Sequence, residues 1–282
     1  MRNQTTIARE VLVEGIGLHT GQQAELRFCQ SDADTGMRFV SEGEESREPL
    51  TASPLAVIST NRGTSLRGAN GMEVQTVEHL MAACFGLGID NVLFRLRGPE
   101  VPAGDGSCLA FVEALSQAGR VSLARPRKSV ALSCPVWVAD SDACLVALPA
   151  AAMEVTFAVA YPFIGSQLAS FVPEPGSFAC DIAPARTFGF EHEAGQILAA
   201  GLAQGASKDN VLLIGEKGYS SPPRFADEVV RHKILDLLGD LALIGLDLEC
   251  RIVAIRSGHR LNNQLARAVL SQIETGGCDV HA

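Results

Sequence analysis

The chain has 282 residues, of which 47% are hydrophobic and 20% charged, and its formal net charge is −9. This length suits one large domain or two medium-sized domains, each able to bury a hydrophobic core. The acidic balance argues against nonspecific nucleic-acid binding, which depends on a basic face, although a local cluster of cations would be enough to hold a phosphorylated small molecule.

The eight cysteines form no Cys-x-x-Cys pair, and most lie in apolar contexts. This usage is typical of reduced, buried thiols in a cytoplasmic protein, so cysteine ligation of a metal is disfavoured. The amino terminus is polar and lacks the apolar core of a signal peptide, and no apolar run is long enough to span a membrane. We therefore expect a cytoplasmic protein and leave peripheral membrane contact open.

The first half of the chain predicts strands, a helix, a strand, a loop and a second helix. The glycine-rich segment 15–21 is best interpreted as a turn between two strands, because no helix or βαβ unit follows it as a phosphate loop would require. Alternation predicts a strand at 23–28, and an apolar run that begins at Glu78 predicts a helix. A strand at 91–96 and, after a loop, a helix at 111–117 follow.

The same order recurs in the second half, where His232 begins the helix that corresponds to the one begun by His79, 232 − 79 = 153 positions earlier. The repeat predicts two similar α+β domains, at 1–122 and 128–282, divided at a charged, proline-containing segment. The segment 191–218 has no counterpart in the first half and reads as an insertion near the site. The strands and helices expected in the second half are 152–159, 227–240, 248–254 and 265–271.

Three side chains of the two corresponding helices fit a divalent metal. His232 and Asp236 are four residues apart and face the same side of their helix, and His79 begins the other helix. Two imidazoles and one carboxylate leave a tetrahedral zinc with an open position, which is typical of catalytic zinc sites. The pattern indicates metal-assisted hydrolysis, whereas a structural or solvent-exposed role is the more common one for any single histidine.

Nearby polar residues extend this hypothesis. Glu78 is a candidate base for a metal-activated water, or else a solvated carboxylate at a helix start, stabilised by the helix dipole. Asp240 either orients a histidine or is a surface acid. His259 follows a glycine in a loop and could protonate a leaving amine or stabilise an oxyanion. Lys233 could bind an anion, but a lysine beside a metal ligand is more often solvated.

Seven motifs, taken in order, resemble those of the zinc-dependent UDP-3-O-acyl-N-acetylglucosamine deacetylases of lipid A biosynthesis. The resemblance runs from about residue 5 to about residue 272. The motifs are Gly15-x-Gly-Leu-His-Thr-Gly21, Thr76-Val-Glu-His-Leu80, Asp105-Gly-Ser107, Ala185-Arg-Thr-Phe-Gly-Phe190, Phe225-Ala-Asp-Glu-Val-Val-Arg-His-Lys233, Asp236-x-x-Gly-Asp240 and Ser257-Gly-His259-x-Leu-Asn-Asn263.

The resemblance implies hydrolysis of the 2-acetamido group of a UDP-linked, 3-O-acylated glucosamine, with release of acetate, as the committed step of lipid A synthesis. It implies two α+β domains, each a mainly antiparallel sheet packed on two helices, with the helices of the two domains facing each other and one insert per domain. The second insert, at about 190–219, would form a hydrophobic passage for the acyl chain. Its apolar residues, which would line the passage or serve ordinary packing, are Ile197, Leu198, Leu202 and Val211.

Carried over position by position, the resemblance assigns a role to each matching residue. It implies a Zn²⁺ cofactor, with Fe²⁺ as an alternative ion, a UDP-3-O-acyl-N-acetylglucosamine substrate and a monomeric protein. The zinc ligands would be His79, His232 and Asp236; the base Glu78; the acid His259 with its partner Asp240; the oxyanion hydroxyl Thr187; and the substrate contacts Lys233, Phe188 and Tyr161.

Departures from the family pattern affect only the expected nucleotide contacts. Tyr161 stands where the family often has phenylalanine, and Asp142-Ala143 offers no lysine for a diphosphate. A zinc amidohydrolase with another acyl-sugar or nucleotide substrate is therefore a second hypothesis. A non-enzymatic binding protein is a third, but retention of Glu78 and His259 argues against it, because binding alone needs no base.

Overall fold

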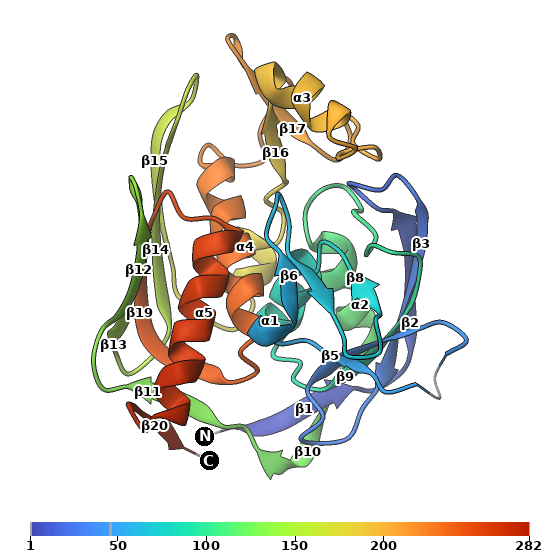
Figure 1. The fold of residues 1–282 in the computed structure, drawn as a ribbon, viewed down its shortest axis with the longest axis vertical. Helices are drawn as coiled ribbons and strands as arrows, with labels where there is room; N and C mark the ends of the chain where they lie inside the picture. Colours follow the sequence, from blue (N-terminus) through green and yellow to red (C-terminus); the bar gives the residue numbers. More distant parts are fainter. Residues whose placement is uncertain (1, 45–46, 282) are drawn as a thin grey trace.

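Two sheets flank a central layer of helices in the computed structural model, which describes residues 2–44 and 47–281 (Figure 1). The first sheet has five strands, in the order β2 (Val11–Ile16), β3 (Gln23–Gln30), β9 (Val92–Arg97), β4 (Met37–Ser41) and β5 (Leu50–Thr51). The second sheet has seven: β12 (Val136–Asp140), β13 (Ala143–Pro149), β19 (Asp247–Ile255), β11 (Ser129–Leu132), β20 (Cys278–His281), and β14 (Glu154–Tyr161) on β19 with β15 (Gly165–Phe171) beyond it.

The two sheets repeat one topology. In the first, β9 pairs antiparallel with β3 and parallel with β4. In the second, β19 pairs antiparallel with β13 and parallel with β14. Each of these central strands directly follows a buried helix, because a parallel pair needs a crossover connection. The prediction of an α+β fold with mainly antiparallel sheets is confirmed.

Four helices lie between the sheets, two from each half: α1 (Glu78–Leu87), α2 (Leu109–Ala118), α4 (Glu228–Ala242) and α5 (His259–Glu274). Helix α1 packs directly on α4, and a Cβ atom at Gly239 would clash with the carbonyl oxygen of Glu78. Leu80 and Leu237 are fully buried, since both helices are covered on all sides. This close approach holds the start of α1, which carries His79, against α4, which carries His232 and Asp236.

The charged segment at the predicted domain boundary, around residues 120–128, contains a strand. β10 (Arg120–Pro126) pairs antiparallel with β1 (Asn3–Ile7) in a two-stranded sheet. Almost every residue of β10 is exposed, so its charged composition reflects contact with water rather than irregular structure. The division into domains at 1–122 and 128–282 stays a prediction.

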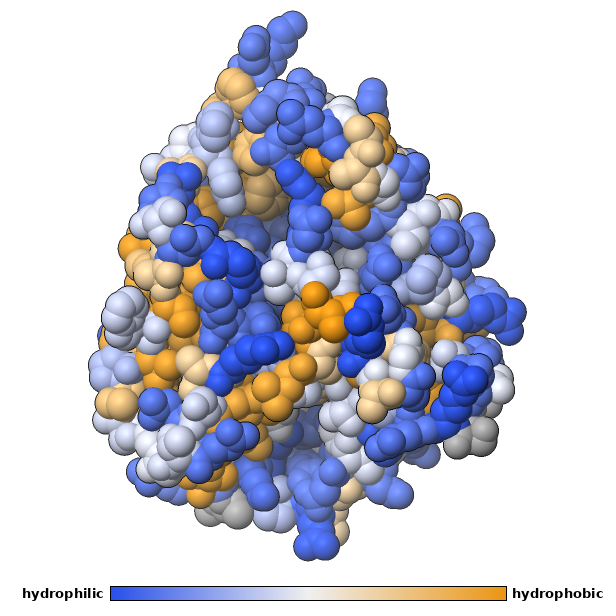
Figure 2. Space-filling model, in the orientation of Figure 1, coloured by the Kyte–Doolittle hydropathy of each residue, from blue (hydrophilic) through white to orange (hydrophobic). Residues whose placement is uncertain are grey.

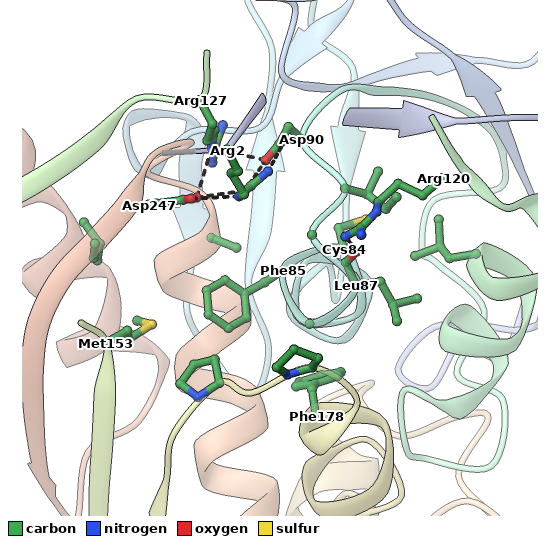
Figure 3. A pocket seen from close by; sticks show the side chains of 18 of the residues that line it. Arg2, Cys84, Phe85, Leu87, Asp90, Arg120, Arg127, Met153, Phe178 and Asp247 are labelled. Atoms are coloured by element: carbon green, nitrogen blue, oxygen red, sulfur yellow. Dashed lines mark hydrogen bonds and ion pairs between the residues drawn. The ribbon is translucent and has the colours of Figure 1, made fainter. Parts of the chain in front are cut away.

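A cluster of two arginines and two aspartates joins the halves at the carboxyl ends of α1 and α4 (Figure 3). Arg2 lies 2.6 Å from Asp90 and 3.0 Å from Asp247, and Arg127 lies 3.1 Å and 3.0 Å from the same carboxylates. Asp90 precedes β9 and Asp247 begins β19, so the cluster follows the repeat. A cavity of about 850 Å³ beside it is lined by apolar side chains that include Phe85.

Each half also carries an insert. The first insert is a three-stranded sheet of β6 (Val57–Ser59), β7 (Ser65–Arg67) and β8 (Glu73–Val74), preceded by the 3-10 turn Pro54–Ala56. The second lies above the start of α4 (Figure 1). It contains β16 (Phe188–Phe190), a 3-10 turn Glu191–Glu193, α3 (Ala194–Ala199), β17 (Leu212–Gly215) and β18 (Gly218–Tyr219), and a π-helical turn, Phe178–Ile182, precedes it.

The cysteines are free thiols, and five of the eight are buried. Burial raises the pKa of the Cys250 thiol to about 12, which disfavours the reactive thiolate. Within the described residues, no helix combines the length and the apolar character needed to cross a bilayer.

Candidate metal centre

The side chains of His79, at the start of α1, and of His232 and Asp236, one turn apart on α4, converge on one point. Their potential ligand atoms all lie within 4.8 Å of one another. Asp236 Oδ1 is 3.7 Å from His79 Nε2 and 3.4 Å from His232 Nε2. Ligand atoms held tetrahedrally at about 2.1 Å from one ion lie about 3.4 Å apart, so the spacing fits a divalent metal after small adjustments. All three residues are buried.

The surroundings of His232 hold it in the form that binds a metal. Its Nδ1 lies 3.1 Å from the carbonyl oxygen of Ala185, to which a protonated Nδ1 donates. Nε2 is then the unprotonated nitrogen, and it is the one that lies toward Asp236. Burial lowers the pKa of His232 to about 4, against the opposing effect of Asp236. The imidazole is therefore neutral near pH 7.

Lys233 is not the solvated lysine that its place beside a ligand suggested. It is 8% exposed, and its Nζ donates to Asp236 Oδ2 over 2.7 Å. Burial alone would raise the pKa of Asp236, but Lys233 and the nearby histidines hold it well below its ordinary range. The expectation of a solvated side chain is wrong, because α4 is enclosed by α1, β14 and β15.

Glu78 and His259 lie beside this centre. Glu78 is 3% exposed, and its Oε2 accepts a hydrogen bond of 2.9 Å from the backbone N–H of Thr64. Its other oxygen, Oε1, lies 3.9 Å from His259 Nε2, which is also 3.9 Å from Asp236 Oδ2. Burial raises the pKa of Glu78. The carboxylate is therefore not a solvated group at a helix start.

Asp240 is the partner of His259 and not a surface acid. It is fully buried, and its Oδ2 lies 2.9 Å from His259 Nδ1. The same oxygen accepts from Asn262 Nδ2 over 2.8 Å, while Oδ1 accepts from Thr64 Oγ1 over 2.6 Å. Burial alone would lower the pKa of His259, but Asp240, Asp236 and Glu78 raise it to about 9. The histidine is accordingly a cation near neutral pH.

A cavity of about 320 Å³ opens at this centre, and the space-filling view shows this face of the molecule hollowed beneath the second insert (Figure 2). Asp240 lies behind His259 and does not line the cavity. The other nine residues predicted for the site all line it: Glu78, His79, Tyr161, Thr187, Phe188, His232, Lys233, Asp236 and His259.

A second cavity of about 330 Å³ adjoins the first, and both are lined by Thr187 and Phe188. Of the apolar insert residues singled out in the sequence, Ile197, Leu198 and Val211 line this second cavity, whereas Leu202 does not. The insert thus forms an apolar chamber next to the polar centre.

The glycine-rich turn between β2 and β3 has a role that sequence reasoning missed. Its residues His19 and Thr20 donate backbone N–H groups to the buried carboxylate of Glu100, at 3.0 and 2.8 Å. The turn also accepts hydrogen bonds from the insert, where Gln204 N–H donates to the carbonyl of His19 over 3.1 Å. The turn therefore anchors the insert over both cavities. The sequence signals were a cluster of glycines without a phosphate-loop context and the match of this segment to a family motif, and neither names Glu100 as its partner.

The fold and this donor set describe an α+β protein with a candidate metal centre of the kind that metal-dependent hydrolases use. The sequence matches the family model of UDP-3-O-acyl N-acetylglycosamine deacetylase over residues 4–271. The chain therefore belongs to this family.

Curated relatives support the assignment over nearly the whole length of the chain. A protein of Thermosynechococcus vestitus is 43% identical over 272 residues, covering 95% of this chain and 94% of its own. One of Geotalea uraniireducens is 40% identical over 276 residues, covering 96% and 90%, and one of Nostoc sp. is 38% identical over 276 residues, covering 95% and 98%. All three are named UDP-3-O-acyl-N-acetylglucosamine deacetylase. The family and the donor triad together indicate a metal cofactor.

Proposed function

We propose that the protein hydrolyses the 2-acetamido group of UDP-3-O-(3-hydroxyacyl)-N-acetylglucosamine, giving UDP-3-O-acyl-glucosamine and acetate, in the committed step of lipid A biosynthesis. Membership of the family and the names of its relatives support this substrate. The observation that carries the chemistry is the buried donor triad with a carboxylate and a cationic histidine beside it, at 3.9 Å from each other.

The metal we propose is Zn²⁺, held by His79, His232 and Asp236. When bound there, the ion would supply Lewis acidity toward the amide carbonyl and toward water. Fe²⁺ is the alternative, because two imidazoles and a carboxylate suit both ions.

Glu78 is the proposed general base. Its Oε2 is held by the N–H of Thr64, so Oε1, the oxygen nearest His259, is the one available to take a proton from the attacking water. A carboxylate whose pKa is raised by burial is a stronger base than an exposed one.

His259 is the proposed general acid, and Asp240 is its positioning partner. The bond between Nδ1 and Asp240 leaves the Nε2 proton directed toward the centre, where it can be given to the departing amine nitrogen. Thr187 is the proposed donor to the developing oxyanion. Its backbone is fixed in place, because its N–H donates to the carbonyl of Gly106 over 2.7 Å and its carbonyl accepts from Leu212.

The remaining lining residues suit the substrate proposed. The rings of Tyr161 and Phe188 lie 5.6 Å apart and offer apolar faces to a sugar or a nucleotide base. Lys233 adds a cation for a polar substrate group, and the adjoining apolar chamber of about 330 Å³ takes the acyl chain. We further propose a monomer in the cytoplasm that contacts the inner membrane peripherally, since its substrate carries an acyl chain.

The test is acetate release by zinc-loaded protein from the acylated UDP-sugar. We expect saturable turnover that is abolished by removing the metal and weakened when the 3-O-acyl chain is absent. Turnover confined to other acyl-sugar amides would instead favour a different amidohydrolase, and tight binding without turnover would contradict a catalytic role.

A further inference from the structure

Thr64 links the two carboxylates of the site, which belong to different halves of the molecule. It is fully buried in the first insert, next to the start of β7. Its backbone N–H donates to Glu78 Oε2 over 2.9 Å, and its hydroxyl donates to Asp240 Oδ1 over 2.6 Å. Glu78 lies on α1 and Asp240 on α4, so one residue contacts both the proposed base and the partner of the proposed acid.

We propose that Thr64 is a positioning residue that fixes Asp240, and through it His259, relative to Glu78. A catalytic role for Thr64 rests on the proposed function, whereas its hydrogen bonds to Glu78 and Asp240 do not depend on turnover.

The argument begins with the two oxygens of Asp240. Oδ2 lies within hydrogen-bond distance of both His259 and Asn262, while among the described residues Thr64 supplies the side-chain donor to Oδ1. Hydrogen bonds to a charged group are strong, and leaving a buried acceptor without its donor is costly. Without the hydroxyl, the carboxylate gains by turning toward another donor. Such a turn changes the direction of its bond to His259.

The backbone around Thr64 is held by other contacts, so its hydroxyl can be tested separately. The carbonyl of Thr64 accepts from Val77 N–H over 3.1 Å. Arg62 occupies the left-handed backbone region at φ 59°, and a Cβ on Gly63 would lie 3.2 Å from Glu78 Oε1. Replacing the side chain of Thr64 by valine keeps its volume and its N–H, and removes only the bond to Asp240.

The experiment compares Thr64→Val with Thr64→Ser, which keeps the hydroxyl. In Thr64→Val we expect kcat to fall about 10- to 100-fold, as for other residues that orient a reacting histidine, with KM and metal content near wild type. Thr64→Ser should recover most of kcat. Should the valine variant fail to fold, Thr64→Ala takes its place in the comparison with serine.

Thr5→Val is the matched control for general destabilisation. Thr5 is also a buried threonine with a hydrogen-bonded hydroxyl, which donates to the carbonyl of Gly88 and lies 3.3 Å from Asp90, at the other end of α1. We expect Thr5→Val to lower the melting temperature without changing kcat. An equal fall of kcat in Thr5→Val and Thr64→Val would refute a positioning role for Thr64.

A spectroscopic readout does not depend on turnover. The Nδ1 proton of His259, bonded to Asp240, should give a downfield proton NMR signal, assigned by its loss in His259→Gln. We expect Thr64→Val to shift or broaden this signal and Thr64→Ser to preserve it. An unchanged signal together with wild-type kcat would overturn the proposal. If wild-type protein releases no acetate, the proposed function fails, whereas the NMR comparison still decides the positioning.

Discussion

The Nε2 atom of His259 lies 3.9 Å from Oε1 of Glu78, although the two residues are 259 − 78 = 181 positions apart. One begins α5 and the other begins α1, so each half of the molecule contributes one of them. Both pKa values are raised, which suits an acid and a base working together. Burial raises the pKa of Glu78. Burial alone would lower the pKa of His259, but the surrounding carboxylates raise it to about 9.

Replacing the proposed base should separate metal binding from turnover. We expect Glu78→Gln to retain its metal and to lose about 10²- to 10⁴-fold in kcat, because the amide cannot take a proton from water. Elemental mass spectrometry and an acetate-release assay on the same sample check both parts. A variant with normal activity would rule out Glu78 as the base.

Replacing a proposed metal ligand should remove the metal together with the activity. We expect His232→Ala to lose stoichiometric metal, and activity with it, since one imidazole and one carboxylate remain. His192→Ala is the matched control, because this histidine is exposed and stands outside the triad. Metal-to-protein ratios after dialysis measure the difference, and a full metal content in His232→Ala would contradict the ligand assignment.

The pH dependence follows from His259. A general acid must be protonated, so activity should fall as the pH rises through the pKa of this histidine, which is about 9 without a metal and lower beside a bound cation. Asp240→Asn removes the charge that raises this pKa, and the alkaline fall of kcat should therefore move to lower pH. Profiles of wild type and variant, both zinc-loaded, test this, and coincident alkaline limbs would refute it.

The same shift has a consequence for the stability of the metal-free protein. Folding raises the pKa of His259 from its ordinary 6.5 to about 9. Its contribution to the free energy of unfolding is therefore complete below pH 6.5 and is lost as the pH rises toward 9. Urea denaturation of the metal-free wild type should show a fall in the free energy of unfolding between pH 6.5 and 9. In His259→Gln, the part of this fall that the histidine causes should be absent. Parallel pH dependence in the two proteins would contradict the shift.

Glu100 should control how firmly the insert is held. Its carboxylate accepts from both backbone N–H groups of the turn and from the hydroxyls of Thr20 and Thr76. We expect Glu100→Gln to cost about 1–3 kcal/mol of unfolding free energy and to raise KM for the acylated substrate. Glu73→Gln, at an exposed pair with Arg67, is the control. Unchanged stability in Glu100→Gln would show that the turn is held by other contacts.

The apolar chamber should set the tolerance for acyl length. We expect Val211→Trp to reduce kcat/KM for long acyl chains more than for short ones, because the larger side chain fills part of the chamber. Leu202→Trp is the matched control, since Leu202 lies in the same insert but outside the chamber lining. Equal losses for all chain lengths would place the acyl group elsewhere.

Local spacing was enough to predict that His232 and Asp236 lie on one helix face, because a helical turn is determined by residues close in sequence. The repeat and the family resemblance extended this to His79 and predicted the α+β fold. The alternative of a solvated Lys233 was wrong, because burial depends on segments distant along the chain. For the same reason the sequence did not reveal that residues 120–126, at the predicted domain boundary, pair as a strand with β1.

The sequence by itself determined which side chains could bind a metal and move protons, and on which helices they stand. Only the tertiary structure decided that Thr64 meets Asp240, 240 − 64 = 176 positions away, and that Glu100 holds the turn under the insert. A buried threonine or glutamate has no spacing pattern that names its partner. The partner is chosen when packing brings distant segments together and every buried polar group must be satisfied.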